Sequence, residues 1–215
     1  MATRRRANRV ADGRDVVLSG VTLAKEALSV LHLPGASILE QYVNAAYEKR
    51  KAAAREILID AIKREGVENL QFEEGDADEL VQMMMRFAKA AEEGTARQNL
   101  KLLAQVIFGL KRNRTFEFDK FQAYANVLET LTRDEILFLG RMYRFYTDNP
   151  DKNDYRAFLA SLSGTFETTQ AESLAAALTR TGMLLPISAF GATNYAPAEH
   201  LFEICELAQV EHTSP

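Results

Sequence analysis

The sequence has few of the residues that support disulfide, metal or redox chemistry. Among 215 residues there are one cysteine, three histidines and no tryptophan. The single Cys205 excludes an internal disulfide and a cysteine-rich metal site. Only five prolines and eleven glycines interrupt the chain, so long regular elements are expected. No apolar run reaches the ~18 uncharged residues of a membrane-spanning helix, and with no targeting signal the cytoplasm is the expected compartment.

Recognisable catalytic motifs are also missing. There is no glycine-rich phosphate loop and no serine in a nucleophile elbow. His200 and Glu203 are three residues apart and share a helix face, but two residues fall short of a zinc site, so we interpret them as a surface pair. The sequence therefore predicts no enzyme, with no catalytic residue, cofactor, metal or small-molecule substrate.

Charge is distributed unevenly along the chain. The formal net charge is −4, yet residues 1–14 hold five arginines against one aspartate, and residues 132–215 hold six basic against eleven acidic residues. We expect residues 1–14 to be a basic, flexible arm that binds nucleic acid, anionic lipid or an acidic protein, or that is simply a solvated terminus. The candidate nucleic-acid contacts in the arm are Arg4, Arg5, Arg6 and Arg9.

Residues 15–131 show helical periodicity throughout. Apolar residues recur at three- and four-residue spacing over residues 15–32, 38–65, 77–93, 95–110 and 116–131, which predicts a helical bundle. Polar residues three positions apart predict capping boxes at five helix starts. These pairs are Ser37 with Glu40, Asp76 with Glu79, Thr95 with Gln98, Thr132 with Glu135, and Thr169 with Glu172.

A methionine cluster within this bundle admits two interpretations. Three consecutive methionines occupy positions 83–85, followed by Phe87. Methionine fills irregular gaps in a core, and it also lines adaptable partner-binding grooves. Met83, Met84 and Phe87 are therefore candidates both for the core and for a partner surface.

The order of elements after residue 131 is typical of a winged helix. Three helical segments are followed by apolar residues 183–187, a turn at 189–192, residues 193–195 and a last helix opened by Pro197. This pattern predicts a winged-helix-like module over residues 132–210, with one small β-hairpin and a recognition helix at 170–181. The chain is thus predicted to be all-α, a helical bundle followed by this module. Candidate DNA contacts are Gln170, Ser173 and Arg180.

The charge of the module argues against DNA binding. A DNA reader neutralises phosphates with several lysines or arginines, whereas the expected recognition helix offers one arginine and one acidic residue, Arg180 and Glu172. Winged helices also serve as packing or dimerisation modules. Our leading hypothesis is a non-enzymatic protein that binds a protein partner or itself as a homo-oligomer. The alternative is a winged-helix DNA-binding transcriptional regulator.

Three blocks of the C-terminal half also resemble a known family. Leu102, Leu103 and Ala104 form one block, residues 128–136 a second, and residues 181–183 with 195–205 a third. Together they resemble the abortive-infection alpha type of bacterial proteins over about residues 95–210. The resemblance implies a bacterial or phage protein linked to phage defence, and it implies no catalytic residues.

Overall fold

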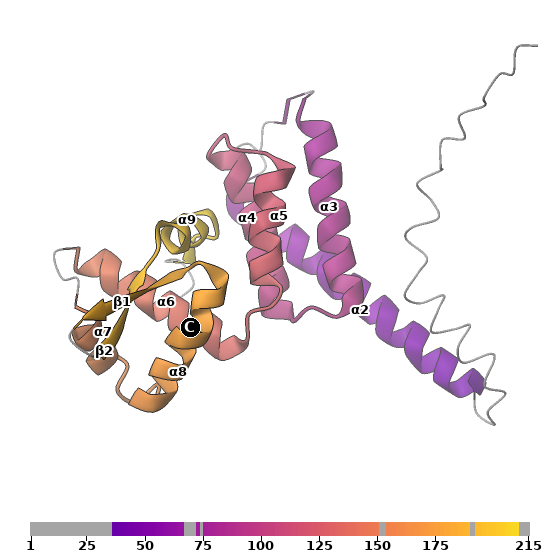
Figure 1. The fold of residues 1–215 in the computed structure, drawn as a ribbon. Helices are drawn as coiled ribbons and strands as arrows, with labels where there is room; N and C mark the ends of the chain where they lie inside the picture. Colours follow the sequence, from indigo (N-terminus) through magenta and orange to yellow (C-terminus); the bar gives the residue numbers. More distant parts are fainter. Residues whose placement is uncertain (1–35, 67–71, 74, 151–153, 190–191, 211–215) are drawn as a thin grey trace, which may run out of the picture. The chain divides into compact units, whose positions relative to one another are not determined.

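The computed structural model describes residues 36–66, 72–73, 75–150, 154–189 and 192–210, with the side chains of 36–43, 189 and 192 left aside. Among the described residues, those from 50 to 210 belong to one compact unit and those from 36 to 49 to another. The chain is mostly α-helical with a single two-stranded hairpin in the described part, as predicted (Figure 1). The expected arm at 1–14 and the expected helix at 15–32 lie outside the described residues.

Four helices are described within the expected bundle, and only residues 50–65 of the first belong to the same unit as the others. The four helices are α2 (Ala36–Glu65), α3 (Asp76–Glu93), α4 (Arg97–Arg112) and α5 (Phe118–Leu128). Gly66 and Gly94 follow α2 and α3 with φ values of 79° and 89°, a left-handed conformation that glycine adopts without strain and that ends a helix.

Helix α4 is the centre of the core. Every residue from Leu103 to Leu110 is buried, so the helix is covered on all sides, unlike a surface helix with one apolar stripe. It contacts α3, α5 and α9. At its start the buried Asn99 amide donates to the backbone oxygens of Leu128 (2.7 Å), the last residue of α5, and of Leu131 (2.8 Å), in the segment before α6, which satisfies carbonyls without a helical partner.

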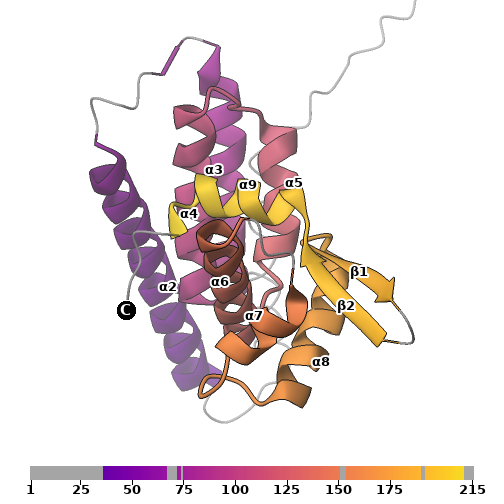
Figure 2. The same cartoon turned by 90° about the vertical axis from the view of Figure 1, so that its left-hand side faces the viewer.

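The module after residue 131 has the element order of a winged helix. Helices α6 (Arg133–Asp148), α7 (Tyr155–Ser161) and α8 (Thr168–Leu178) are followed by a 3₁₀ turn (Thr179–Thr181). The hairpin β1 (Leu184–Ala189) and β2 (Ala192–Pro197) and helix α9 (Glu199–Leu207) complete it. The strands pair antiparallel, from Leu184 opposite Pro197 to Ala189 opposite Ala192. Helix α9 lies across α4 and α6, so the module and α4 share one core (Figure 2).

Some predicted element starts are corrected by the structure. The Thr132–Glu135 capping box is confirmed. Three others are wrong, because α3, α4 and α8 begin at Asp76, Arg97 and Thr168 without a side-chain cap. The side chains of the Ser37–Glu40 pair lie outside the described residues. Pro197 does not open the last helix: it ends β2 opposite Leu184, and α9 begins two residues later.

Candidate functional site

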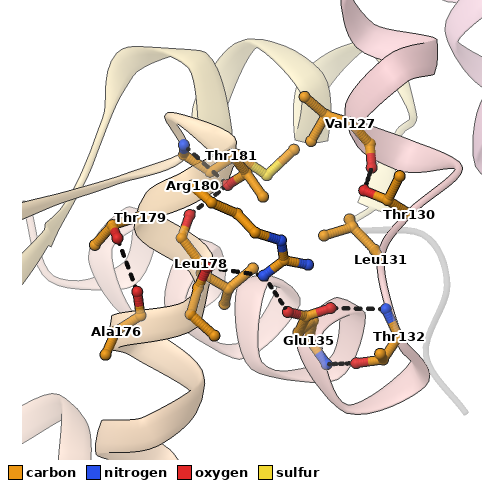
Figure 3. Close-up of polar contacts among 12 residues, drawn as sticks. Val127, Thr130, Leu131, Thr132, Glu135, Ala176, Leu178, Thr179, Arg180 and Thr181 are labelled. Atoms are coloured by element: carbon orange, nitrogen blue, oxygen red, sulfur yellow. Dashed lines mark hydrogen bonds and ion pairs between the residues drawn. The ribbon is translucent and has the colours of Figure 1, made fainter.

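The surface of α8 and the hairpin is the candidate site, and an ion pair beneath it holds α8 in place. Glu135 lies in the first turn of α6 and is buried. One carboxylate oxygen accepts from the Thr132 backbone N–H at 2.8 Å, and the other accepts from the Arg180 guanidinium at 2.6 Å. Figure 3 shows Arg180 reaching from the end of α8 to this carboxylate.

Arg180 forms its hydrogen bonds with groups of the same chain. The guanidinium also donates to the Ala177 carbonyl at 2.8 Å. Its hydrogen bond holds the pKa of Glu135 below its ordinary value, and Glu135 in turn raises the pKa of Arg180. Since the arginine's charge is matched by a buried carboxylate, little of it is left for a phosphate. The assignment of Arg180 as a nucleic-acid contact stays a prediction, and these bonds weigh against it.

The exposed face of α8 presents neutral and acidic groups. Gln170, Glu172 and Ser173 are exposed, and the Ser173 hydroxyl donates to the Thr169 backbone oxygen at 2.8 Å. Between Thr168 and Leu178 the helix has no lysine or arginine. Gln170 and Ser173 are thus accessible, as a DNA contact requires, but on a helix face without a cation to hold a phosphate.

The hairpin exposes two large apolar side chains. Leu185 is 53% exposed and Ile187 is 45% exposed, while Leu184 at the start of β1 is buried. Residues two apart on a strand lie on the same face, so Leu185 and Ile187 form one apolar strip, which we call the wing strip. This strip was not among the residues predicted from the sequence. The two-residue spacing of Leu185 and Ile187 indicates one strand face, but the consecutive apolar residues 183–185 hide this alternation in the sequence.

Of the two interpretations of the methionine cluster, the core interpretation describes Met83 and Phe87, which are not on the surface. Met83 and Phe87 are 0% and 1% exposed, because the side of α3 that carries them packs in the core with α4 and α5. Met84 is half-buried against the same core. The exposed methionine of α3 is Met85, four residues after the exposed Val81. The arginines Arg4, Arg5, Arg6 and Arg9 lie outside the described residues.

The His200–Glu203 pair belongs to a contact between α9 and α5. The two side chains are 4.0 Å apart, and Glu203 also pairs with Lys120 of α5 at 2.5 Å. The His200 ring packs on Tyr124, with 5.1 Å between centroids. Lysine and tyrosine complete the cluster where a metal would need further ligands, so the pair fastens α9 to α5. In the described residues no group of three or more metal-binding side chains forms.

Comparisons with protein-family models, with curated proteins and with solved structures gave no match. Within the described part of the chain, no helix combines the length and apolar character needed to cross a membrane.

Proposed function

We propose that the chain is a non-enzymatic interaction protein that self-associates through the wing strip of its winged-helix-like module. The observation that supports this most directly is the exposure of Leu185 and Ile187 on the same face of β1. Large apolar side chains exposed on an ordered strand are typical of an interface. Burying them against a second copy would gain about 25 cal/mol for each Å² removed from water.

The strip favours face-to-face packing over strand addition. Pro186 lies between Leu185 and Ile187 in β1 and has no N–H to donate to a new strand, which is how edge strands avoid pairing. Two copies related by a two-fold axis would bring the same strip into contact from both sides. The resemblance to the abortive-infection alpha type supports a bacterial or phage setting for this assembly, in phage defence, in the cytoplasm.

Light scattering coupled to size-exclusion chromatography tests this function. We expect the wild-type chain to elute with a mass above the 24.1 kDa of one copy. The double variant Leu185→Lys/Ile187→Lys should give the single-copy mass. The matched control is Val81→Lys/Met85→Lys, which adds the same two charges to the similarly exposed face of α3 and should leave the assembly intact. A wild-type monomer, or dissociation caused by the α3 variant alone, would contradict the proposal.

DNA binding remains the second candidate, because the element order places α8 where a recognition helix lies. A gel-shift titration at two salt concentrations tests it with the full chain. Micromolar binding that weakens steeply with salt supports a regulator. Because the two hairpin strands carry no charged residue and Arg180 is paired with Glu135, we expect no gel shift at low salt.

A further inference from the structure

A cavity of about 870 Å³ lies apart from the wing strip, among α4, α6, β2 and α9. Its lining residues come from the end of α4, the second half of α6, the end of β2 and α9, with Pro150 and Gln209 from the segments that follow α6 and α9. This volume lies in the range of pockets that enclose a small organic ligand.

Aromatic rings form much of the wall. Tyr143 and Tyr146 come from α6 and Phe202 comes from α9. The rings of Tyr143 and Phe202 lie 5.8 Å apart at a tilt of 58°. Because Tyr143 is buried, the accessible ring surface of the wall comes mainly from the half-buried Tyr146 and Phe202. Pro150 and Pro197 add apolar surface. Such walls suit a flat, aromatic ligand, and the faces of the rings attract a positive charge.

The two charged residues of the lining are not equivalent. Arg112 pairs with Glu65 at 2.6 Å and donates to the backbone oxygens of Glu206 and Leu207 at 3.1 and 3.3 Å. Its positive charge is therefore matched by a carboxylate and by the carbonyls at the end of α9, which carry the negative end of the helix dipole.

Glu206 supplies the cavity with a negative charge. It is an exposed residue of the lining, and its neighbour Cys205 also lines the cavity. Burial first, and then the charge of Glu206, raise the pKa of the Cys205 thiol to about 12. The thiol is thus neutral, which leaves Glu206 as the acidic residue of the lining.

We propose that this cavity binds a flat organic cation, whose rings lie against Tyr146 and Phe202 and whose charge is matched by Glu206. Because Arg112 is already bonded to Glu65 and to two backbone oxygens, it offers little attraction to an anionic ligand. The proposal does not depend on self-association, because no residue of the wing strip lines the cavity.

A pair of dyes with opposite charge tests the proposal with the full chain. Rhodamine 6G is a cation and fluorescein is an anion, and both are built on a three-ring xanthene. In fluorescence anisotropy titrations at pH 8 we expect rhodamine 6G to bind with a micromolar Kd and fluorescein at least tenfold more weakly. Equal or tighter binding of fluorescein, or no binding of rhodamine 6G at 100 µM dye or protein, would overturn the proposal.

Two variants of lining residues test whether the dye binds in the cavity. Glu206→Gln should raise the Kd for rhodamine 6G about fivefold, the size of a partly exposed charge pair, and Phe202→Leu should raise it about threefold or more. The matched control is Glu199→Gln, which removes an exposed carboxylate of α9 that does not line the cavity and should leave the Kd unchanged. Circular dichroism confirms that each variant folds. Equal effects of Glu206→Gln and Glu199→Gln would refute the assignment, and so would loss of binding in the Leu185→Lys/Ile187→Lys variant.

Discussion

Gly109 is the position where one added carbon should damage the fold most. It lies buried in the middle of α4, where α9 crosses. A Cβ built on Gly109 would lie 2.8 Å from the carbonyl carbon and the Cα of Leu207, and closer still to the Leu207 oxygen. All three atoms belong to the backbone, so no side-chain rotation can relieve the contact. We therefore predict that Gly109→Ala forces α9 away from α4.

Two opposing effects set the magnitude. Alanine is the better helix former, and in an open helix interior Gly→Ala gains about 1 kcal/mol. Overpacking a rigid core costs about 1–3 kcal/mol and sometimes more. Here the Leu207 backbone must retreat from 2.8 Å to the 3.4 Å at which ordinary contact begins. That movement strains the bonds of Arg112 to the Glu206 and Leu207 oxygens as well. We expect a net loss of about 2 kcal/mol in the free energy of unfolding.

Thermal unfolding followed by circular dichroism measures this loss. For a chain of this size about 2 kcal/mol corresponds to a fall in Tm of about 4–8 °C. Gly140→Ala is the matched control, because Gly140 also lies within a helix, α6, and its added Cβ would meet only the Val210 side chain at 3.9 Å. The control should gain up to about 1 kcal/mol from helix propensity.

Two outcomes would contradict the predicted clash between Gly109→Ala and the Leu207 backbone. If Gly109→Ala unfolds at the wild-type temperature or above it, then α9 does not cross α4 at this distance. If both variants lose stability equally, the loss does not come from the α4–α9 crossing.

Two further predictions concern buried polar groups. Asn99→Ala should lower the free energy of unfolding by about 2 kcal/mol in urea titrations, because the Leu128 and Leu131 oxygens lose their donor. Gln98→Ala, at the exposed neighbour, should change it little. Glu135→Gln should cost about 1 kcal/mol at pH 7, a value discounted for the partial exposure of Arg180. Since the pKa of Glu135 is lowered in the folded chain, its contribution is present above pH ~4.5 and is lost as the pH falls further. Wild type and variant should therefore converge in stability in urea titrations between pH 7 and pH 3, and a constant gap across that range would argue against the ion pair.

The fold could be predicted from the sequence where local patterns decide it. Helices with apolar stripes, glycine stops and the Thr132–Glu135 box all depend on residues a few positions apart. Local spacing alone did not predict the helix starts of α3, α4 and α8, where the expected capping boxes are absent. Asp76 accepts instead from the Glu73 N–H at 2.7 Å and from Lys111, and Glu79 accepts from the Phe118 N–H. Lys111 and Phe118 lie more than 30 residues away in sequence, so local spacing could not reveal these competing partners.

The candidate site was less predictable than the fold, because exposure depends on tertiary packing. The spacing of Met83 and Phe87 placed them on one helix face but did not reveal that α4 and α5 cover it. Arg180 carried the only positive charge of the expected recognition helix, and its partner Glu135 is 45 residues away. The cavity joins residues from Arg112 to Gln209, a separation over which no sequence motif extends.

Helix α9 connects the three features on which the proposals depend. One side crosses Gly109 of α4, another lines the cavity through Phe202 and Glu206, and its first residue follows β2 after a single alanine. The Ala198 N–H also donates to the Met183 oxygen at 2.8 Å, which fixes the start of α9 to the base of the hairpin. A ligand in the cavity would therefore contact the same helix that positions the wing strip.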